Sequence, residues 1–210
     1  SLANTGAIIN VNGCHFINNH KSVELQLYHH LDANYNPIPY KATFRNCDFM
    51  VDNNYRGDAL DYNFDAHASM GEVEGVRFYG CKFYNNNTGG SKGAGYGINS
   101  YNAGYSVQPS PPGFNPSDRS VFNGFRAGIL AEGDNFAMQP NVMVRKADFD
   151  INSIGIWAKN VNNFSSFENS YTIGHAPMVG SCYNNIGIYS INCHQFAIEE
   201  NTFTGANSNV

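Results

Sequence analysis

Gly155-Ile156-Trp157-Ala158-Lys159-Asn160 and Gly187-Ile188-Tyr189-Ser190-Ile191-Asn192 are two copies of one sequence unit. Their first residues lie 187 − 155 = 32 positions apart, and the same offset relates Tyr171 to Phe203. A fixed period of about 20–50 residues is the sequence mark of a solenoid or array, in which each repeat packs on its neighbours. The chain is therefore expected to be a stack of similar coils.

Two short landmarks alternate along the rest of the chain. The first is a small residue, one spacer and an aromatic residue: Cys14-His15-Phe16, Cys47-Asp48-Phe49, Cys81-Lys82-Phe83, Ser120-Val121-Phe122, Ala147-Asp148-Phe149, Asn169-Ser170-Tyr171 and Asn201-Thr202-Phe203. The second is a small residue followed by an aliphatic one: Ser22-Val23, Ala59-Leu60, Gly97-Ile98, Gly128-Ile129, Gly155-Ile156 and Gly187-Ile188.

Each landmark lies in a short run of alternating apolar and polar residues, which predicts a β-strand. Asn and Gly, which accept the left-handed backbone of tight corners, separate the runs. No stretch keeps helical apolar spacing over three turns. The pattern predicts an all-β parallel β-helix, a single domain over 1–210 with loop insertions at 28–40, 88–96, 108–116 and 173–183.

Two packing predictions follow from this register. The aromatic residues of the first landmark should be buried and stacked, because a slip of one residue would turn each ring to solvent: Phe16, Phe49, Phe83, Phe149, Tyr171 and Phe203. Cys14, Cys47 and Cys81 should be reduced and should point inward, one above another. Two coil steps are about 9.6 Å, which is too far for a disulfide between Cys14 and Cys81.

Composition excludes several classes of function. The net charge is −5 and no basic cluster is present, which argues against nucleic acid and against an anionic membrane surface. No apolar run approaches the ~18 residues that cross a bilayer, so membrane insertion is not expected. Charged residues make up only 14%, whereas aromatic residues also reach 14%, so the chain is expected to fold.

The units Gly97 to Asn102, Gly155 to Asn160 and Gly187 to Asn192 share the pattern Gly-Ile-x-Ser/Ala-x-Asn. With the Asn-x-aromatic motif that follows, this pattern resembles the right-handed parallel β-helix proteins of the pectin-lyase-like superfamily. The resemblance implies a right-handed parallel β-helix of about six coils. The composition also resembles that of large secreted surface proteins of Bacteroidota-type bacteria. Both ends of the chain fall inside the repeat pattern and neither carries an amphipathic capping helix, so a fragment of a longer chain is expected.

Outward-facing positions of equivalent strands form columns along a solenoid, because residues alternate between the two faces of a strand. One column is expected to read Glu24, Asp61, Asn99, Leu130, Trp157, Tyr189, and the column two positions on Gln26, Asn63, Tyr101, Glu132, Lys159, Ile191. Aromatic rings bind sugar faces while carboxylates and amides bind hydroxyl groups. We expect a carbohydrate site at Trp157, Tyr189, Tyr101 and Glu132; ordinary outward-facing residues are the alternative.

Charged neighbours do not define a catalytic site in the sequence. Asp48 and Lys82 should be adjacent on neighbouring coils with Arg45 near, which is more typical of a cross-strand charge pair than of a lyase centre. A metal site formed by His29, His30 and His67 is the alternative to surface-loop histidines. No catalytic residue, metal ligand or cofactor is assigned.

Two classes of function compete at this point. The first is a non-enzymatic, secreted or cell-surface bacterial module for adhesion or glycan binding, whose partners are a polysaccharide or another surface component and adjoining segments of the same longer chain. The second, implied by the resemblance, is a polysaccharide lyase or glycoside hydrolase. The lack of a convergent charged cluster in the sequence favours the first.

Overall fold

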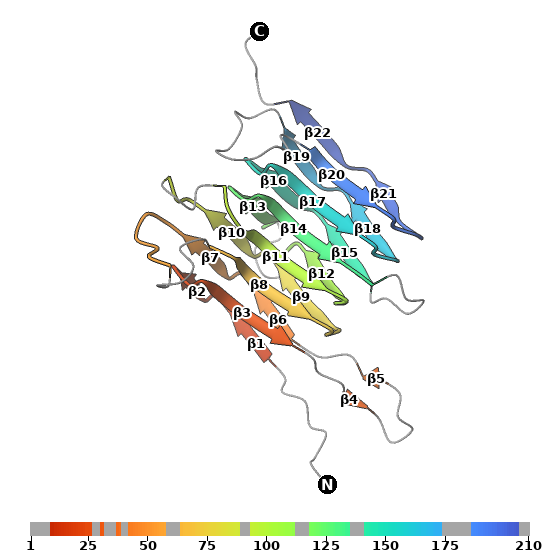
Figure 1. Cartoon of the computed structure of the whole chain (residues 1–210), viewed down its shortest axis with the longest axis horizontal. Coiled ribbons are helices and arrows are strands. Elements are labelled where there is room, and N and C mark those ends of the chain that lie inside the picture. The colour runs from red at the N-terminus through yellow and green to blue at the C-terminus, as the bar shows by residue number, and fades with distance from the viewer. Residues whose placement is uncertain are drawn as a thin grey trace.

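The structure is a computed structural model, and it describes residues 9–26, 30–31, 37–38, 42–57, 64–88, 93–111, 118–134, 141–173 and 186–205. All helices and strands assigned within these residues are β-strands; no helix occurs there. The strands of the three large sheets are parallel (Figure 1). Successive strands enter three sheets in turn, so the chain winds as a parallel β-helix. In the described part, six coils contribute a strand to all three sheets and a seventh contributes to two, which confirms the predicted fold class.

The strands of each sheet follow the order of the coils. The first sheet contains β1 (Ile9–Asn12), β6 (Ala42–Arg45), β9 (Val76–Tyr79), β12 (Tyr105–Gln108), β15 (Val142–Arg145), β18 (Phe164–Phe167) and β21 (Ala197–Glu199). The second contains β2 (His15–Ile17), β7 (Asp48–Val51), β10 (Lys82–Asn85), β13 (Ser120–Asn123), β16 (Ala147–Asp150), β19 (Ser170–Ile173) and β22 (Thr202–Gly205). The third contains β3 (Lys21–Gln26), β8 (Ala66–Gly71), β11 (Tyr96–Tyr101), β14 (Ala127–Glu132), β17 (Ile154–Lys159) and β20 (Ile186–Ile191). Outside them, β4 (His30–Leu31) pairs antiparallel with β5 (Pro37–Ile38).

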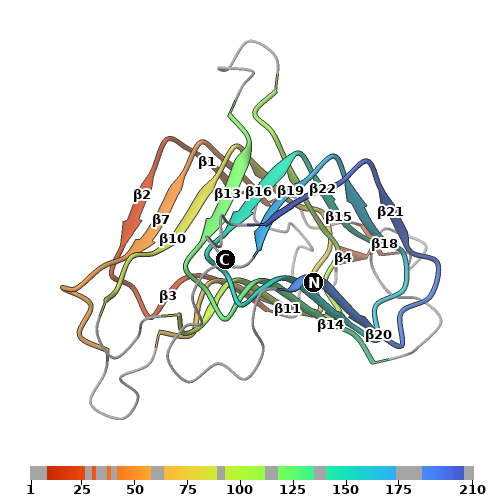
Figure 2. The same ribbon diagram turned by 90° about the horizontal axis from the view of Figure 1, so that it is seen from above.

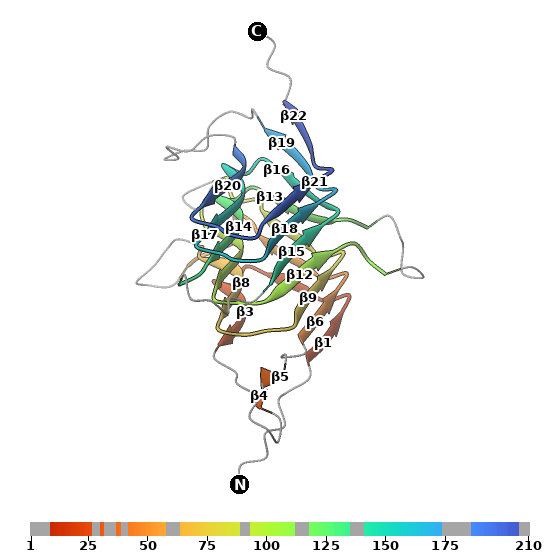
Figure 3. The same cartoon turned by 90° about the vertical axis from the view of Figure 1, so that its right-hand side faces the viewer.

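The register places equivalent residues of successive coils opposite one another. Phe49 lies opposite Phe16 on one side and Phe83 on the other, and Ile156 lies opposite Ile129 and Ile188 in the same way. Side chains of one kind therefore stack along the axis at the spacing of parallel strands, about 4.8 Å. Figure 3 shows this stack of coils, from the one with β1 at one end to the one with β21 and β22 at the other.

Figure 2 shows the ribbon of the three sheets around the interior of the β-helix. A column of seven aromatic rings runs through this interior. Neighbouring rings are nearly parallel, with interplanar angles from 3° to 10° and centroid distances from 4.6 to 4.9 Å. The column consists of Phe16, Phe49, Phe83, Phe122, Phe149, Tyr171 and Phe203. The predicted stacking of the first landmark is thus confirmed.

The prediction that all these rings are buried is wrong at the two ends of the column. Phe203 is 50% exposed and Phe16 is only half-buried, whereas Phe83 and Phe122 are completely buried. The reason is geometric, since a ring in the first or last described coil has a neighbouring ring on one side only.

The aromatic column packs directly against the glycine residues of the second landmark, which leaves no room for a side chain there. A Cβ atom on Gly128 would lie 2.8 Å from Phe149 Cδ1, and one on Gly187 would lie 2.4 Å from Phe203 Cε1. Such distances are shorter than real Cβ contacts allow, so only glycine fits without displacing the ring. The two landmarks that alternate in the sequence therefore contact each other in the core.

Single residues with left-handed backbone make the corner between the first and second sheets in most coils. Gly13 and Asn46 fit the expectation of Asn or Gly at corners, with φ of 62° and 49°. Lys146, Glu168 and Glu200 adopt the same conformation with φ of 51°, 53° and 55°, which the sequence did not suggest. Corner hydrogen bonds such as Asn46 N–H to Tyr79 O, 2.8 Å, hold these residues in place by pairing them with the next coil.

Two of the three aligned thiols are buried as predicted. Cys47 and Cys81 are free and completely buried, and the Cys47 and Cys81 carbonyl oxygens accept hydrogen bonds from Lys82 and Val121 of the next coil. Cys14 is also free, but it is exposed, because it belongs to the first coil. Its Sγ lies 3.7 Å from the Asn12 carbonyl oxygen, and Cys47 and Cys81 make the same contact with the residue two positions before them, so Cys14 differs from the other two thiols in its burial.

The second coil differs from the predicted alignment. Val23 of β3 lies opposite Ala68 of β8, not opposite Leu60, so the pair that fills the second landmark is His67-Ala68. His67 occupies the place that later coils give to glycine, which hid the repeat in the sequence. Residues 58–63, to which the prediction pointed, lie outside the described residues. The expected columns are corrected accordingly: Ser69 replaces Asp61, and Gly71 replaces Asn63.

Candidate functional site

The outward face of the third sheet carries the four residues predicted to bind carbohydrate. Trp157 and Tyr189 lie opposite each other on β17 and β20, and Tyr101 and Glu132 lie opposite each other on β11 and β14. The two pairs occupy the two adjacent columns expected from the alternation of residues along these strands. The structure thus brings all four onto one face.

The Trp157 end of this face is partly occupied by protein side chains. The Trp157 and Tyr189 rings have centroids 5.9 Å apart and are tilted by 47°, so they do not form one flat platform. The Arg126 guanidinium carbon lies 5.8 Å from the Trp157 ring centroid, in a cation–π arrangement. Glu132 forms an ion pair with Lys159 at 3.0 Å. The predicted insertion beside this end, 173–183, lies outside the described residues except for Ile173 at the end of β19.

The Tyr101 end is open. The Tyr101 side chain is 47% exposed, and its ring borders a hollow of about 330 Å³ on β3, β8 and β11. Gly71 causes this hollow, because it stands between Gln26 and Tyr101 in the column and has no side chain. A Cβ atom at Gly71 would have no other atom within 4 Å.

The hollow combines an aromatic wall with neutral hydrogen-bonding groups and one carboxylate. Its lining includes the Ser69 hydroxyl, the Asn99 amide and the Glu72 carboxylate, besides Gln26 and Tyr101. Beside it, the hydrogen bond from Lys21 holds the pKa of Glu24 below its usual value, so this carboxylate is ionised at neutral pH. Sequence reasoning missed Ser69, Gly71 and Glu72 because it aligned the second coil wrongly.

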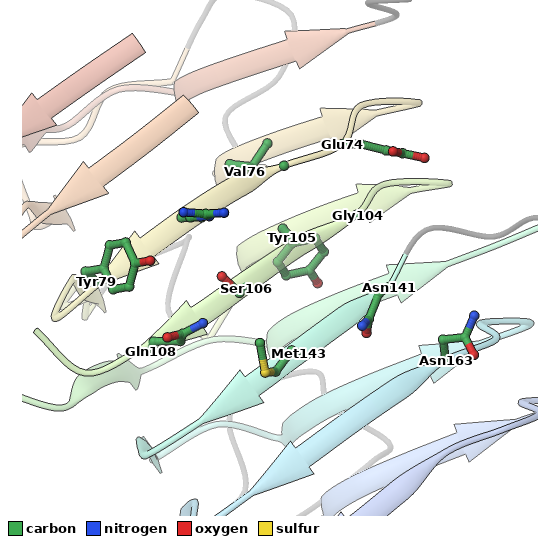
Figure 4. A pocket seen from close by; sticks show the side chains of 12 residues that line it. Glu74, Val76, Tyr79, Gly104, Tyr105, Ser106, Gln108, Asn141, Met143 and Asn163 are labelled. Atoms are coloured by element: carbon green, nitrogen blue, oxygen red, sulfur yellow. The ribbon is translucent and has the colours of Figure 1, made fainter. Parts of the chain in front are cut away.

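A larger groove of about 730 Å³ lies on the outward face of the first sheet (Figure 4). It crosses β9, β12 and β15, and Figure 4 shows Tyr79 and Gln108 at one end and Glu74, Asn141 and Asn163 at the other. No feature of the sequence pointed to this face, since its outward residues share no repeated chemistry.

The charged residues considered for catalysis, Asp48, Lys82 and Arg45, each bind a different partner and not one another. Asp48 and Lys82 are register partners, as expected. Asp48, however, pairs with His15 Nδ1 at 2.8 Å, while Lys82 Nζ donates a hydrogen bond to the Arg119 carbonyl oxygen at 2.6 Å. Arg45 lies on the first sheet, where its guanidinium stacks on Tyr79 with 5.5 Å to the ring centroid.

His67 does not belong to a surface metal site. It is completely buried, and burial lowers its pKa to about 3, so the ring is neutral. Its Nε2 lies 3.0 Å from the Tyr84 carbonyl oxygen, which requires a proton on Nε2, and Nδ1 then accepts the Ser22 hydroxyl at 3.2 Å. His29 lies outside the described residues. Among the residues that the structure describes, no three His, Cys, Asp or Glu side chains are grouped so as to hold a metal ion.

The fold places the chain in the class of parallel β-helix proteins. No protein-family model, no curated protein and no solved structure matches it. In the described ranges no helix has the length and apolar character needed to cross a membrane.

Proposed function

We propose that this β-helix is a non-enzymatic glycan-binding module and that the hollow beside Tyr101 is its binding site. The observation that carries the proposal is the exposed Tyr101 ring next to the open space above Gly71. A sugar ring can lie in that space with its apolar face on the tyrosine, while its hydroxyl groups bind the amides and hydroxyl of the lining. The volume, about 330 Å³, is at the lower end of the range for small-molecule sites.

The same proposal shifts the centre of the predicted site. Trp157 and Tyr189 remain on the same face, but Arg126 and the tilt between the rings leave less free aromatic surface there. A chain of sugar units could continue from the Tyr101 hollow along the columns towards Glu132 and Trp157, because these residues follow on successive strands. Tyr101 is therefore the main contact in this proposal, and Trp157 is a secondary one.

Membership of the pectin-lyase-like superfamily and a secreted or cell-surface location are part of the proposal. Support comes from the glycine–isoleucine and Asn-x-aromatic motifs, which the fold uses as packing elements, and from a surface with few charges. A polysaccharide of the cell surface or of the surroundings is the proposed partner.

The test is binding to a glycan array, followed by calorimetry with the glycans that bind. Tyr101→Ala removes the ring, and we expect at least a tenfold loss of affinity. Gly71→Leu fills the hollow without strain, because its backbone is not left-handed and its Cβ meets no atom, so this variant should fold and lose binding. Gly205→Leu is the matched control, since Gly205 on β22 is equally open and lies on another sheet.

Two results would contradict the proposal. Wild-type protein that binds no glycan on a broad array would remove the function, and unchanged affinity in Gly71→Leu would place the binding elsewhere. Trp157→Ala should weaken binding of long oligosaccharides more than that of short ones, because Trp157 on β17 lies two strands beyond β11, which carries the Tyr101 edge of the hollow.

A further inference from the structure

The groove on the first sheet has a simple structural cause. On β12 and the residue before it, the outward positions are Gly104, Ser106 and Gln108. The first two are small, whereas the neighbouring strands carry Arg77 and Met143 at the positions opposite Ser106. Small side chains on β12 between larger side chains on β9 and β15 leave a trough of about 730 Å³ along β12 (Figure 4). The shape thus comes from the backbone register of three interior coils.

Two arginine residues lie at the side of the trough that β9 forms. Arg77 lines the trough opposite Ser106 and is exposed. Arg45 on β6 is outside the lining but is the diagonal neighbour of Arg77, since Arg45 lies opposite Tyr79 and Thr43 lies opposite Arg77. None of the ion pairs formed by the described residues includes either arginine. Two uncompensated guanidinium groups therefore flank Tyr79 on a protein whose net charge is −5.

Arg45 is held in position at this end. Its Nη1 donates a hydrogen bond to Asn10 Oδ1 at 2.6 Å, and its guanidinium lies over the Tyr79 ring. A fixed guanidinium loses less conformational entropy when it binds an anion than a free one does. The Tyr79 end is thus prepared for a negatively charged group.

The rest of the trough offers polar groups without positive charge. Ser106 and Gln108 line its middle and its Tyr79 end, and Asn141, Asn163 and Glu74 line the opposite end. Amide and hydroxyl groups of this kind suit the hydroxyl groups of a sugar, and the Glu74 carboxylate disfavours a second anion there.

We propose that this trough is a second glycan site, which takes a sugar carrying a sulfate or phosphate ester, with the ester between Arg45 and Arg77. A tetrahedral ester presents three terminal oxygens, so two guanidinium groups from adjacent strands can each bind it. A carboxylate presents two terminal oxygens in one plane, so it offers fewer acceptor positions to two guanidinium groups than a tetrahedral ester does. The site lies on a different sheet from the Tyr101 hollow and does not depend on the function proposed there.

The experiment measures binding of defined sugars by calorimetry. The probes are a monosulfated disaccharide, the same disaccharide without sulfate, a sugar monophosphate and a disaccharide with a uronic acid. We expect the sulfated or the phosphorylated sugar to bind at least tenfold more tightly than the neutral and the uronic acid sugars. The two ester arms show which source of the tetrahedral group the trough prefers.

Variants localise the binding. Arg77→Gln and Arg45→Gln should each weaken it at least tenfold, because each removes one charged donor. Arg145→Gln is the matched control: it lowers the net charge equally, but Arg145 already pairs with Glu168 at 2.9 Å and does not line the trough. Tyr101→Ala should leave this binding unchanged.

Three results would overturn the inference. The first is an Arg77→Gln variant that binds the ester sugar as tightly as the wild type does. The second is a wild-type protein that binds the uronic acid sugar as tightly as the ester sugar. The third is a wild-type protein that binds neither the sulfated nor the phosphorylated sugar. Loss of ester binding in Tyr101→Ala but not in Arg77→Gln would assign the anion to the third sheet and would equally overturn it.

Discussion

Gly155 lies against the ring of Tyr171, and a Cβ atom at position 155 would stand 2.7 Å from Tyr171 Cδ1 and 2.5 Å from the Gly187 carbonyl oxygen. The backbone of one sheet therefore forms the wall against which an aromatic ring of another sheet packs. The contact recurs in successive coils, for example between Gly128 and Phe149. It explains why the glycine and the aromatic residue repeat with the same period.

Gly155→Ala should reduce the free energy of unfolding by about 1–3 kcal/mol, the usual cost of an overpacked core. Urea unfolding measures the effect. Gly71→Ala is the control, because its added methyl group meets no atom within 4 Å and should change stability by less than about 0.5 kcal/mol. Equal stability of the Gly155→Ala variant and the wild type would show that the ring can move aside.

The position of a ring in the aromatic column should determine how much its removal lowers the free energy of unfolding. Phe122→Ala should cost about 3–5 kcal/mol, because this buried ring stacks on Phe83 at 4.6 Å and Phe149 at 4.9 Å. Phe203→Ala should cost only about 1 kcal/mol, since half of its surface is already exposed. Thermal unfolding of the two variants gives the comparison, and equal losses would contradict the order.

His67 should make stability depend on pH. Its folded pKa of about 3 lies below the ordinary value of 6.5, so the unfolded chain binds a proton first as pH falls. The contribution of the neutral ring is fully present above pH 6.5 and is lost progressively as pH falls towards 3. At pH 5 the loss is about 2 kcal/mol.

The His67→Gln variant isolates this effect. A glutamine amide can still donate to the Tyr84 carbonyl oxygen, but it does not titrate. The difference in unfolding free energy between wild type and variant should shrink from pH 7 to pH 5. A constant difference over this range would mean that the histidine is already exposed or charged in the fold.

The thiols should differ in their reactivity with iodoacetamide. Cys14 is exposed and should react in the native protein, whereas Cys47 and Cys81 should react only after unfolding. A hydrogen bond from Cys81 holds the pKa of Cys47 below its usual value, so its protection comes from burial and not from low nucleophilicity. Mass spectrometry of peptides locates the label, and rapid native labelling of Cys47 would contradict the packing.

The sequence was sufficient for the fold wherever the glycine and the aromatic residue were both present. Phe83, Phe122 and Phe149 stack as predicted, because the alternation of the strand decides which side chains face inward. The second coil could not be aligned in this way, since His67 replaces the glycine and makes its own hydrogen bonds to Ser22 and Tyr84.

This misalignment also explains why the candidate site was only partly predicted. Tyr101 was placed on the correct face, but the expected neighbour in its column was Asn63, whose side chain would have filled the space that Gly71 leaves open. The trough on the first sheet could not be predicted, because it depends on the small size of Gly104 and Ser106 relative to Arg77 and Met143. Hollows arise from differences between coils, whereas a repeat reveals what the coils share.

Each strand pairing in the three sheets joins one coil only to the next coil, as Phe49 is joined to Phe16 and Phe83. Such a molecule behaves like a one-dimensional chain of interfaces, so heat should fray it from its outer coils, and a melting front should move inward. The trough on β9, β12 and β15 lies on coils between these ends, whereas the Tyr101 hollow includes Gln26 on β3 of the first described coil. The trough should therefore keep its shape, and continue to bind, after the outermost coil has already come apart, whereas the Tyr101 hollow should lose one of its walls.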